Sequence, residues 1–203
     1  HVHTLGPVGT FSYEAAIKIF PAENITLHPN FDQLFTALSG SHNDIGVVPI
    51  KNSLFGSVDE VLDLLIEGPA KLWKTQDIEI HHAFGAKKSD EILKVASHPQ
   101  ALRQCRKWLK IHYPQVEYFP VSSTAFAAEL AAHDPRIGAI ASREQLIVRG
   151  LSVVADDIEG QGNTTRFGII SMSNPYSENT RNQLTLVIRP TIGDRPGLLH
   201  DIL

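Results

Sequence analysis

Hydroxyl and amide side chains recur in this sequence where a predicted strand gives way to a predicted helix. They lie in LGPVGTFS (5–12), VVPIKNSLFGSV (47–58), ASHPQALRQC (96–105) and VSSTAFAAEL (121–130). Each group alone is explained by helix capping, with Ser97 as the expected N-cap in the third group, because Ser, Thr and Asn are common N-cap residues. Four such turns together indicate more, since free N–H groups at helix N-termini attract anions. We therefore predict a site for a small anion, in particular a carboxylate or dicarboxylate. The polar residues at these turns are Thr10, Ser12, Lys51, Asn52, Ser53, Ser97, Gln100, Gln104, Ser122, Ser123 and Thr124.

The stretch GQGNTTRFGII (160–170) adds a fifth polar group. Its apolar end is typical of a buried strand, and Thr164, Thr165 and Arg166 stand directly before that apolar run. Arginine binds carboxylates through paired hydrogen bonds, so Arg166 is a candidate for holding the anion. A threonine hydroxyl does not titrate near neutral pH, and its useful chemistry is to donate a hydrogen bond.

Ten histidines raise the question of a metal site, which the sequence does not support. His81 and His82 are adjacent in a predicted strand, so their side chains point to opposite faces and cannot both bind one ion. His1 and His3 share a face, but no Asp, Glu or Cys at ligand spacing joins them. Cys105, the single cysteine, is expected to be a small buried residue in a helix. We predict neither a metal nor a cofactor.

The composition bounds the class of protein. With 203 residues, 42% of them hydrophobic, the chain can bury a core as a folded soluble protein. A net charge of -4 without blocks of Lys or Arg argues against nucleic acid or an anionic membrane as partner. The sequence has no apolar run near the roughly 20 residues that span a bilayer and no secretory signal pattern. We expect a cytoplasmic location.

Short apolar stretches alternate with helical patterns, which is typical of βαβ units and a mostly parallel sheet. Helices are predicted at about 11–20, 31–38, 58–67, 100–112, 124–132 and 143–148. In the third of these, Ser57 is the expected N-cap and Gly68 the stop. We predict an α/β fold of two lobes, lobe 1 at about 1–79 plus 153–175 and lobe 2 at about 80–152. Ligands of open α/β sheets bind beyond the carboxyl ends of the strands, so we expect a cleft between the lobes.

A polar stretch, SMSNPYSENTRN (171–182), has no periodicity and reads as a linker, which we place at 176–182. After it, QLTLVIRP predicts a strand and GDRPGLLHDIL the start of a helix, with Asp194 as candidate N-cap and Pro196 near the first helical position. The chain is therefore expected to stop inside a second, incomplete module.

Six motifs in register resemble the prephenate dehydratase family over about residues 1–172. They are TLGPVGTFSYEAA, VVPIKNSLFGSV, SHPQALRQC, SSTAFAAELA, GAIAS and NTTRFGII. The stretch LTLVIRPTIGDRPGLLHDIL resembles the opening strand and helix of a ferredoxin-like ACT regulatory domain. That module normally has further strands and a second helix, so 183–203 would be an incomplete ACT domain.

The resemblance implies an enzyme that converts prephenate to phenylpyruvate, water and carbon dioxide in phenylalanine biosynthesis. It implies a two-lobed fold like that of type II periplasmic binding proteins, with the site between the lobes. It further implies homodimers or homotetramers, and phenylalanine as a feedback inhibitor bound to ACT domains. Gly197 and Leu198 are the effector-binding candidates on this basis.

Residue by residue, Thr165 matches the family's essential threonine, expected to donate to the leaving oxygen, with Arg166 and Phe167 beside it. Arg166 would hold a substrate carboxylate or shape the start of the strand. The resemblance places Asn52, Ser53, Ser97 and Gln104 around the substrate, with Thr10, Ser123 and Thr124 as weaker candidates.

One departure from the family pattern concerns charge. The family commonly reads Pro-Ile-Glu-Asn-Ser where this chain has Lys51 in place of the glutamate.

Three alternatives to prephenate dehydration stay open: arogenate dehydration, decarboxylation of prephenate without aromatisation, and non-catalytic binding of a small anion. The threonine-arginine-phenylalanine group argues against the decarboxylase, whose relatives lack it, and a binder would not need Thr165.

Overall fold

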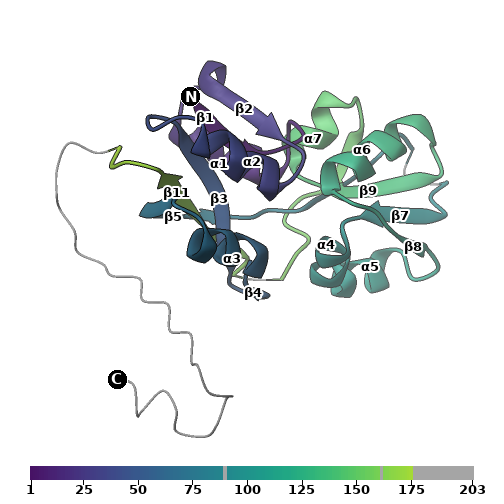
Figure 1. Ribbon diagram of the computed structural model, residues 1–203. Helices are drawn as coiled ribbons and strands as arrows, with labels where there is room; N and C mark the ends of the chain where they lie inside the picture. The colour runs from purple at the N-terminus through teal and green to yellow at the C-terminus, as the bar shows by residue number, and fades with distance from the viewer. Residues whose placement is uncertain (89–90, 161, 176–203) are drawn as a thin grey trace, which may run out of the picture.

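Two lobes, each a β-sheet covered by helices, make up the computed structural model, which describes residues 1–88, 91–160 and 162–175 (Figure 1). The first sheet contains β1 (Val2–Leu5), β2 (Ile25–His28), β3 (Ile45–Asn52), β4 (Gly56–Ser57), β5 (Lys71–Glu79) and β11 (Thr164–Ser171). The second contains β6 (Ala83–Ala86), β7 (Lys94–Ser97), β8 (Glu117–Pro120), β9 (Ile137–Ala141) and β10 (Ser152–Ala155). The predicted two-lobed α/β fold is confirmed.

Strand order shows how the chain divides. The first sheet has the order β2-β1-β3-β11-β5, with β4 paired to β3. In it β1 runs parallel to β2 and β3, while β11 runs antiparallel to both β3 and β5. The second sheet has the order β10-β6-β9-β7-β8. Strand β10 belongs to this second sheet, so the chain returns to the first lobe after residue 155, slightly later than the sequence predicts.

Helices cover both sheets. The first lobe has α1 (Phe11–Ile19), the short 3-10 turn η1 (Ala22–Asn24), α2 (Phe31–Ser39) and α3 (Asp59–Glu67). The second has α4 (Pro99–Gln104), α5 (Arg106–His112), α6 (Thr124–His133) and α7 (Arg143–Val148). The predicted single helix at 100–112 is two helices that meet at Cys105, which is buried as expected. None of the helices in the described ranges is long and apolar enough to cross a membrane.

Two predicted caps are wrong. Ser57 lies in β4, and Val58 precedes α3 without a side-chain cap, although Gly68 ends that helix as predicted. His98, and not Ser97, caps α4, because its Nδ1 accepts from the N–H of Gln100 at 3.3 Å. The Ser97 hydroxyl donates instead to the carbonyl of Ile140 at 2.7 Å, which joins β7 to β9.

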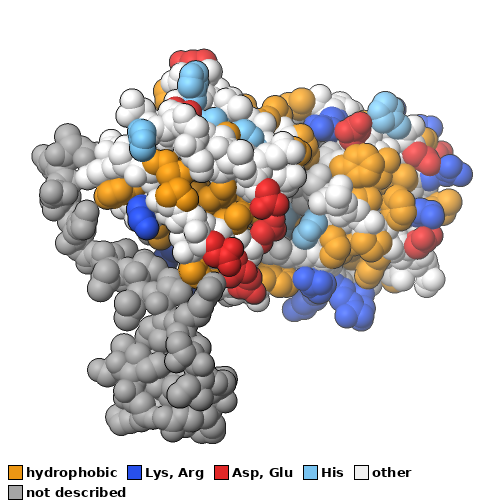
Figure 2. Space-filling view, viewed as in Figure 1, with side chains coloured by type: hydrophobic (Ala, Val, Ile, Leu, Met, Phe, Trp, Pro, Cys, Tyr) orange, Lys and Arg blue, Asp and Glu red, His pale blue; other side chains and the backbone are white. Residues whose placement is uncertain are grey.

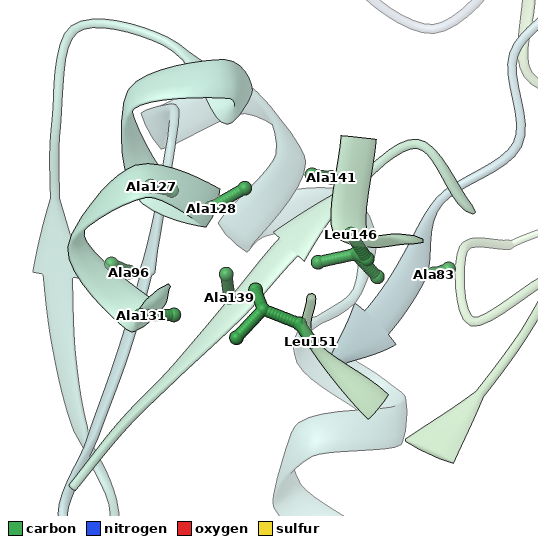
Figure 3. Close-up of a cluster of buried hydrophobic side chains, with 9 residues drawn as sticks. All are labelled: Ala83, Ala96, Ala127, Ala128, Ala131, Ala139, Ala141, Leu146 and Leu151. Atoms are coloured by element: carbon green, nitrogen blue, oxygen red, sulfur yellow. The ribbon is translucent and has the colours of Figure 1, made fainter. Parts of the chain in front are cut away.

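Small side chains shape the core of the second lobe. Ala127, Ala128 and Ala131 of α6 pack toward Ala139 of β9, with Leu146 filling the adjoining space (Figure 3). All five side chains are fully buried. Because alanine projects so little, α6 lies close against the sheet, and the position of β9 relative to this helix is tightly defined.

The lobes are joined by two crossing segments, residues 80–82 and residues 156–160 with 162–163. The N–H of Ile80 donates to the carbonyl of Asn163 at 2.8 Å, and the N–H of Ile158 donates to the carbonyl of His82 at 3.0 Å. These bonds tie the outgoing and returning segments into one ladder between the lobes. The predictions for 176–203, namely the linker and the start of an ACT domain with Gly197 and Leu198, fall outside the described residues.

Side chains also meet across the lobes. The Ser142 hydroxyl at the start of α7 donates to the Glu14 carboxylate on α1. The guanidinium of Arg103 on α4 lies 5.1 Å from the ring centroid of Phe55, which follows β3. Acidic side chains gather on the first lobe and basic ones at the lower edge of the second in Figure 2. The two lobes therefore touch each other at the Ser142–Glu14 and Arg103–Phe55 contacts.

Candidate active site

Thr165 and Asn52 meet in the middle of the first sheet. The two residues are register partners on β11 and β3, so their side chains project from the same face. The Asn52 amide nitrogen donates to the Thr165 hydroxyl at 2.9 Å, and the two residues are only 7% and 8% exposed. Sheet pairing therefore brings together two residues that are 113 positions apart in sequence.

Backbone groups fix the direction of this hydrogen bond. The N–H of Leu54 donates to Asn52 Oδ1 at 3.0 Å, so the Asn52 nitrogen must face the other way, toward Thr165. The Thr165 hydroxyl consequently accepts from Asn52 and keeps its own proton for a further acceptor. This arrangement makes Thr165 a hydrogen-bond donor held in place by its neighbour.

Asn163 connects this pair to the second lobe. Its Nδ2 donates to the carbonyl of Ile80 at 3.1 Å, and because a carbonyl only accepts, Asn163 Oδ1 must face away from it. That oxygen accepts from Asn52 Nδ2 at 3.1 Å and from Gln104 Nε2 at 3.0 Å. Gln104 lies on α4, so one oxygen atom collects donors from both lobes.

Gln104 has a second partner, His82. Gln104 Oε1 lies 2.6 Å from His82 Nε2, and His82 is only 3% exposed. Burial lowers the pKa of His82, while its bond to Gln104 and the Glu159 carboxylate act in the opposite direction. The net lowering favours a neutral imidazole. A neutral His82 ring places no positive charge beside the amide group of Gln104.

Ser53 shapes the turn that precedes Thr165. Its hydroxyl donates to the carbonyl of Gly162 at 2.5 Å and accepts from the N–H of Thr164 at 3.0 Å. The main chain adds a bond from the N–H of Ser53 to the carbonyl of Thr164 at 2.8 Å. Gly162 has a φ of +80°, a conformation that glycine adopts without strain. Ser53, the residue directly after β3, therefore holds the turn that precedes Thr165.

Arg166 lies on the opposite face of β11 from Thr165, since adjacent strand residues alternate. Its guanidinium forms a two-pronged pair with Asp77, with Nε 2.7 Å and Nη2 2.9 Å from the two carboxylate oxygens. This bond lowers the pKa of Asp77 and raises that of Arg166. Lys51 is the register partner of Arg166 on β3 and is exposed. This placement favours a role for Arg166 in shaping the strand, and it puts Lys51 on the face away from Thr165.

The remaining predicted site residues have structural partners. Thr10 and Ser123 cap α1 and α6, accepting from the N–H groups of Tyr13 at 3.3 Å and Phe126 at 3.0 Å. Thr124 is the buried first residue of α6. Ser97 bonds to the second sheet, and Phe167 is 1% exposed in the core of the first lobe. Their predicted binding roles stay predictions, and Asn52, Gln104 and Thr165 are the members that one network joins.

A separate acidic group lies on the crossing segments. His81 Nδ1 is 2.9 Å from an Asp157 oxygen and 3.3 Å from a Glu159 oxygen, and these residues line a pocket of about 260 Å³ beside Thr164. Three such ligand atoms could in principle hold a metal ion. The His81 and Asp157 side chains are 60% and 73% exposed, and ion pairing accounts for the contacts. The predicted strand position of His81 and His82 is wrong, because both lie between β5 and β6; His81 is largely exposed and His82 is 3% exposed.

Comparison with known proteins assigns the chain to a family. The family model described as prephenate dehydratase matches residues 2–175. The chain belongs to the prephenate dehydratase family. A bifunctional chorismate mutase/prephenate dehydratase of Stutzerimonas stutzeri is 36% identical over 206 residues, covering 98% of this chain and 55% of that protein. The prephenate dehydratase of Bacillus subtilis is 32% identical over 216 residues, covering 98% of this chain and 75% of the relative.

A solved structure agrees with the family assignment. The crystal structure of prephenate dehydratase from Arthrobacter aurescens in complex with L-Phe superposes with a TM-score of 0.77 at 27% identity, covering 99% of this chain and 70% of that one. The chain spans about half the length of the bifunctional relatives it matches. The match to the prephenate dehydratase family therefore holds for both the sequence and the fold.

Two residues of the network were missed by sequence reasoning. From the sequence, Asn163 has no predicted role in the site, and His82 is considered only in excluding a metal site. No local signal points to either residue: His82 lies between β5 and β6, outside a strand, and the contacts of Asn163 come from residues 80, 52 and 104.

Proposed function

We propose that this chain catalyses the dehydration and decarboxylation of prephenate, giving phenylpyruvate, water and carbon dioxide on the route to phenylalanine. The observation that carries the proposal is the direction of the Asn52–Thr165 bond, which leaves the threonine proton available to a departing oxygen. Membership of the prephenate dehydratase family supports the choice of substrate.

The chemistry matches what these side chains offer. The bond between the ring and its carboxylate breaks, the electron pair moves into the ring, and the bond to the ring hydroxyl breaks at the far carbon. The departing oxygen takes up one proton and leaves as water, so the reaction has no net redox change and requires no cofactor. Thr165 stabilises the negative charge that develops on this oxygen by hydrogen bonding, the role of preorganised donors in a buried site.

Substitution of Thr165 tests the proposal. Thr165→Ala is expected to lower kcat about 100-fold or more, because a buried donor to the leaving oxygen is lost, while prephenate binding is largely retained. Thr165→Ser keeps the hydroxyl and should retain much of the activity. The assay is phenylpyruvate formation, followed by absorbance in alkali, and arogenate is offered in parallel to distinguish the two dehydratase activities.

A neighbouring residue supplies the matched control. Thr164 is the register partner of Glu79 and is the residue before Thr165, so Thr164→Ala removes the same atoms one position away. This variant should keep kcat within a few-fold of the unmodified protein. Unchanged turnover in Thr165→Ala, or equal losses in the two alanine variants, would reject the assigned role of Thr165.

The biological setting proposed for the whole protein is that of its relatives. Phenylalanine is the proposed effector, supported by the L-Phe complex of the Arthrobacter aurescens protein, with Gly197 and Leu198 as candidates outside the described residues. A homodimer or homotetramer in the cytoplasm is the proposed state. Size-exclusion chromatography with light scattering measures the oligomer, and calorimetry with L-Phe measures effector binding.

A further inference from the structure

His82 holds a polar atom without a partner in the interior. Among the side-chain atoms of the described residues, His82 Nδ1 is the buried nitrogen that has no hydrogen-bond partner. The ring of Phe11 packs against it edge-on, with centroids 5.2 Å apart and an interplanar angle of 78°. A buried nitrogen without a hydrogen-bond partner lowers the stability of the folded protein, and phenylalanine or leucine at this position would avoid that loss. The presence of histidine therefore indicates a role for its other nitrogen, Nε2.

The network determines which nitrogen of His82 carries the proton. The carbonyl of Ile80 orients Asn163, and Asn163 Oδ1 in turn requires Gln104 to present Nε2 toward it. Gln104 Oε1 must then face His82. Because an amide oxygen only accepts, His82 Nε2 carries the hydrogen, and the unpaired Nδ1 is the lone-pair nitrogen.

This donor stabilises the orientation of Gln104. Without it, Gln104 Oε1 would keep only the longer bond from Asn163 Nδ2, at 3.4 Å, and the Gln104 amide would be held by Asn163 alone. A rotated amide would place an oxygen against Asn163 Oδ1, where two acceptors repel. Asn163 would then be free to shift relative to Asn52, which positions Thr165.

We propose that His82 is a positioning residue for Thr165, acting through Gln104, Asn163 and Asn52 as a neutral donor at Nε2. The role rests on the proposed dehydration at Thr165 and deepens it. His82 lies on the crossing segment that leaves the first lobe, and Gln104 lies on the second lobe. The His82–Gln104 bond therefore also keeps the second lobe aligned with the Thr165 hydroxyl of the first.

Three substitutions at His82 separate positioning from packing. The amide nitrogen of glutamine reaches about as far as Nε2, whereas that of asparagine reaches only to the place of Nδ1. We expect His82→Leu and His82→Asn to lower kcat by about 10- to 100-fold with KM changed less than about threefold, since a small misplacement of a catalytic group has effects of this size. His82→Gln should recover kcat to within about fivefold of the unmodified protein. If His82→Leu does not fold, the glutamine and asparagine variants still make the comparison.

An NMR measurement tests the same inference without turnover. Nitrogen-15 spectra of the full chain should show the Nε2–H tautomer at His82, and the side-chain amide protons of Gln104 should lose protection from exchange in His82→Asn but not in His82→Gln. Full activity in His82→Leu or His82→Asn, or an Nδ1–H tautomer in the unmodified protein, would overturn the proposal. Should the unmodified protein fail to convert prephenate while the tautomer and exchange results hold, the proposed reaction falls and the positioning network stands.

Discussion

Glu14 offers a quantitative test of how the two lobes are held together. It lies in the first turn of α1 and accepts a hydrogen bond from Ser142, the residue that caps α7 on the other lobe. Burial raises the pKa of Glu14 from 4.5 to about 7, opposed by the Ser142 bond and by Lys18, with Glu144 raising it further. Below about pH 7 the folded protein therefore favours the neutral carboxylic acid.

The sign of the pH dependence follows from proton binding. Between about pH 4.5 and 7 the folded protein binds more protons at Glu14 than the unfolded chain, so the free energy of unfolding falls as pH rises through this window. Below pH 4.5 the stabilisation is fully present, and above about pH 7 the loss is complete. At 1.36 kcal/mol per pKa unit, the shift corresponds to about 3 kcal/mol, which partial solvent contact reduces to about 2 kcal/mol.

Glu14→Gln removes the titration and keeps an acceptor for Ser142. Urea unfolding at pH 5 and pH 8 should show that the unmodified protein loses about 2 kcal/mol more than the variant over this interval. Glu129→Gln, at an exposed position on α6, serves as the control for loss of one carboxylate. Parallel stability profiles of Glu14→Gln and the unmodified protein would refute the argument that burial at the lobe contact controls this group.

Two further pairs of variants test the packing. Gly9 and Gly56 have the same φ of +83°, so an alanine is equally strained at both positions. The two positions differ in space: a Cβ added at Gly9 would lie 1.3 Å from Gln145 Nε2, whereas a Cβ added at Gly56 would have no neighbour within 4 Å. In urea unfolding, Gly9→Ala should cost at least about 1 kcal/mol more than Gly56→Ala, and equal costs would contradict a close lobe contact. Leu146→Ala, from a fully buried position, should lower stability by about 2 to 5 kcal/mol, whereas Val148→Ala, at 76% exposure, should stay within about 0.5 kcal/mol. A Tm measured by calorimetry checks that pair, and similar shifts in both would refute the core assignment.

The sequence predicts the architecture because periodicity reports burial directly. Helices at 11–20, 31–38 and 124–132 agree with the structure to within about one residue, since their apolar spacing and capping residues are local signals. The break at Cys105 and the capping of α4 by His98 were not predicted, because they depend on how α4 and α5 pack against the second sheet. Local propensity does not contain that information.

The candidate site was predictable in part. Thr165 and Asn52 are both recognisable as polar residues beside buried strands, yet their contact depends on the antiparallel register of β11 and β3. Strand alternation places Arg166 on the other face of the sheet from Thr165, with Asp77. The amide directions in the network required the positions of Leu54 and Ile80, whose main-chain groups have no distinctive residue type.

The central place of β11 in the first sheet has a consequence for the order of folding. Residues 164–171 are inserted between β3 and β5, and the whole second lobe lies between β5 and β11 in the chain. During synthesis the second lobe can complete its own sheet while the first still lacks a central strand. Loop closure over such a separation is slow compared with local contacts. The strand that fills this gap begins with Thr164 and Thr165, so the hydroxyl proposed as the donor becomes positioned only when the first sheet closes. A chain that has not yet added this strand has not brought Thr165 to Asn52.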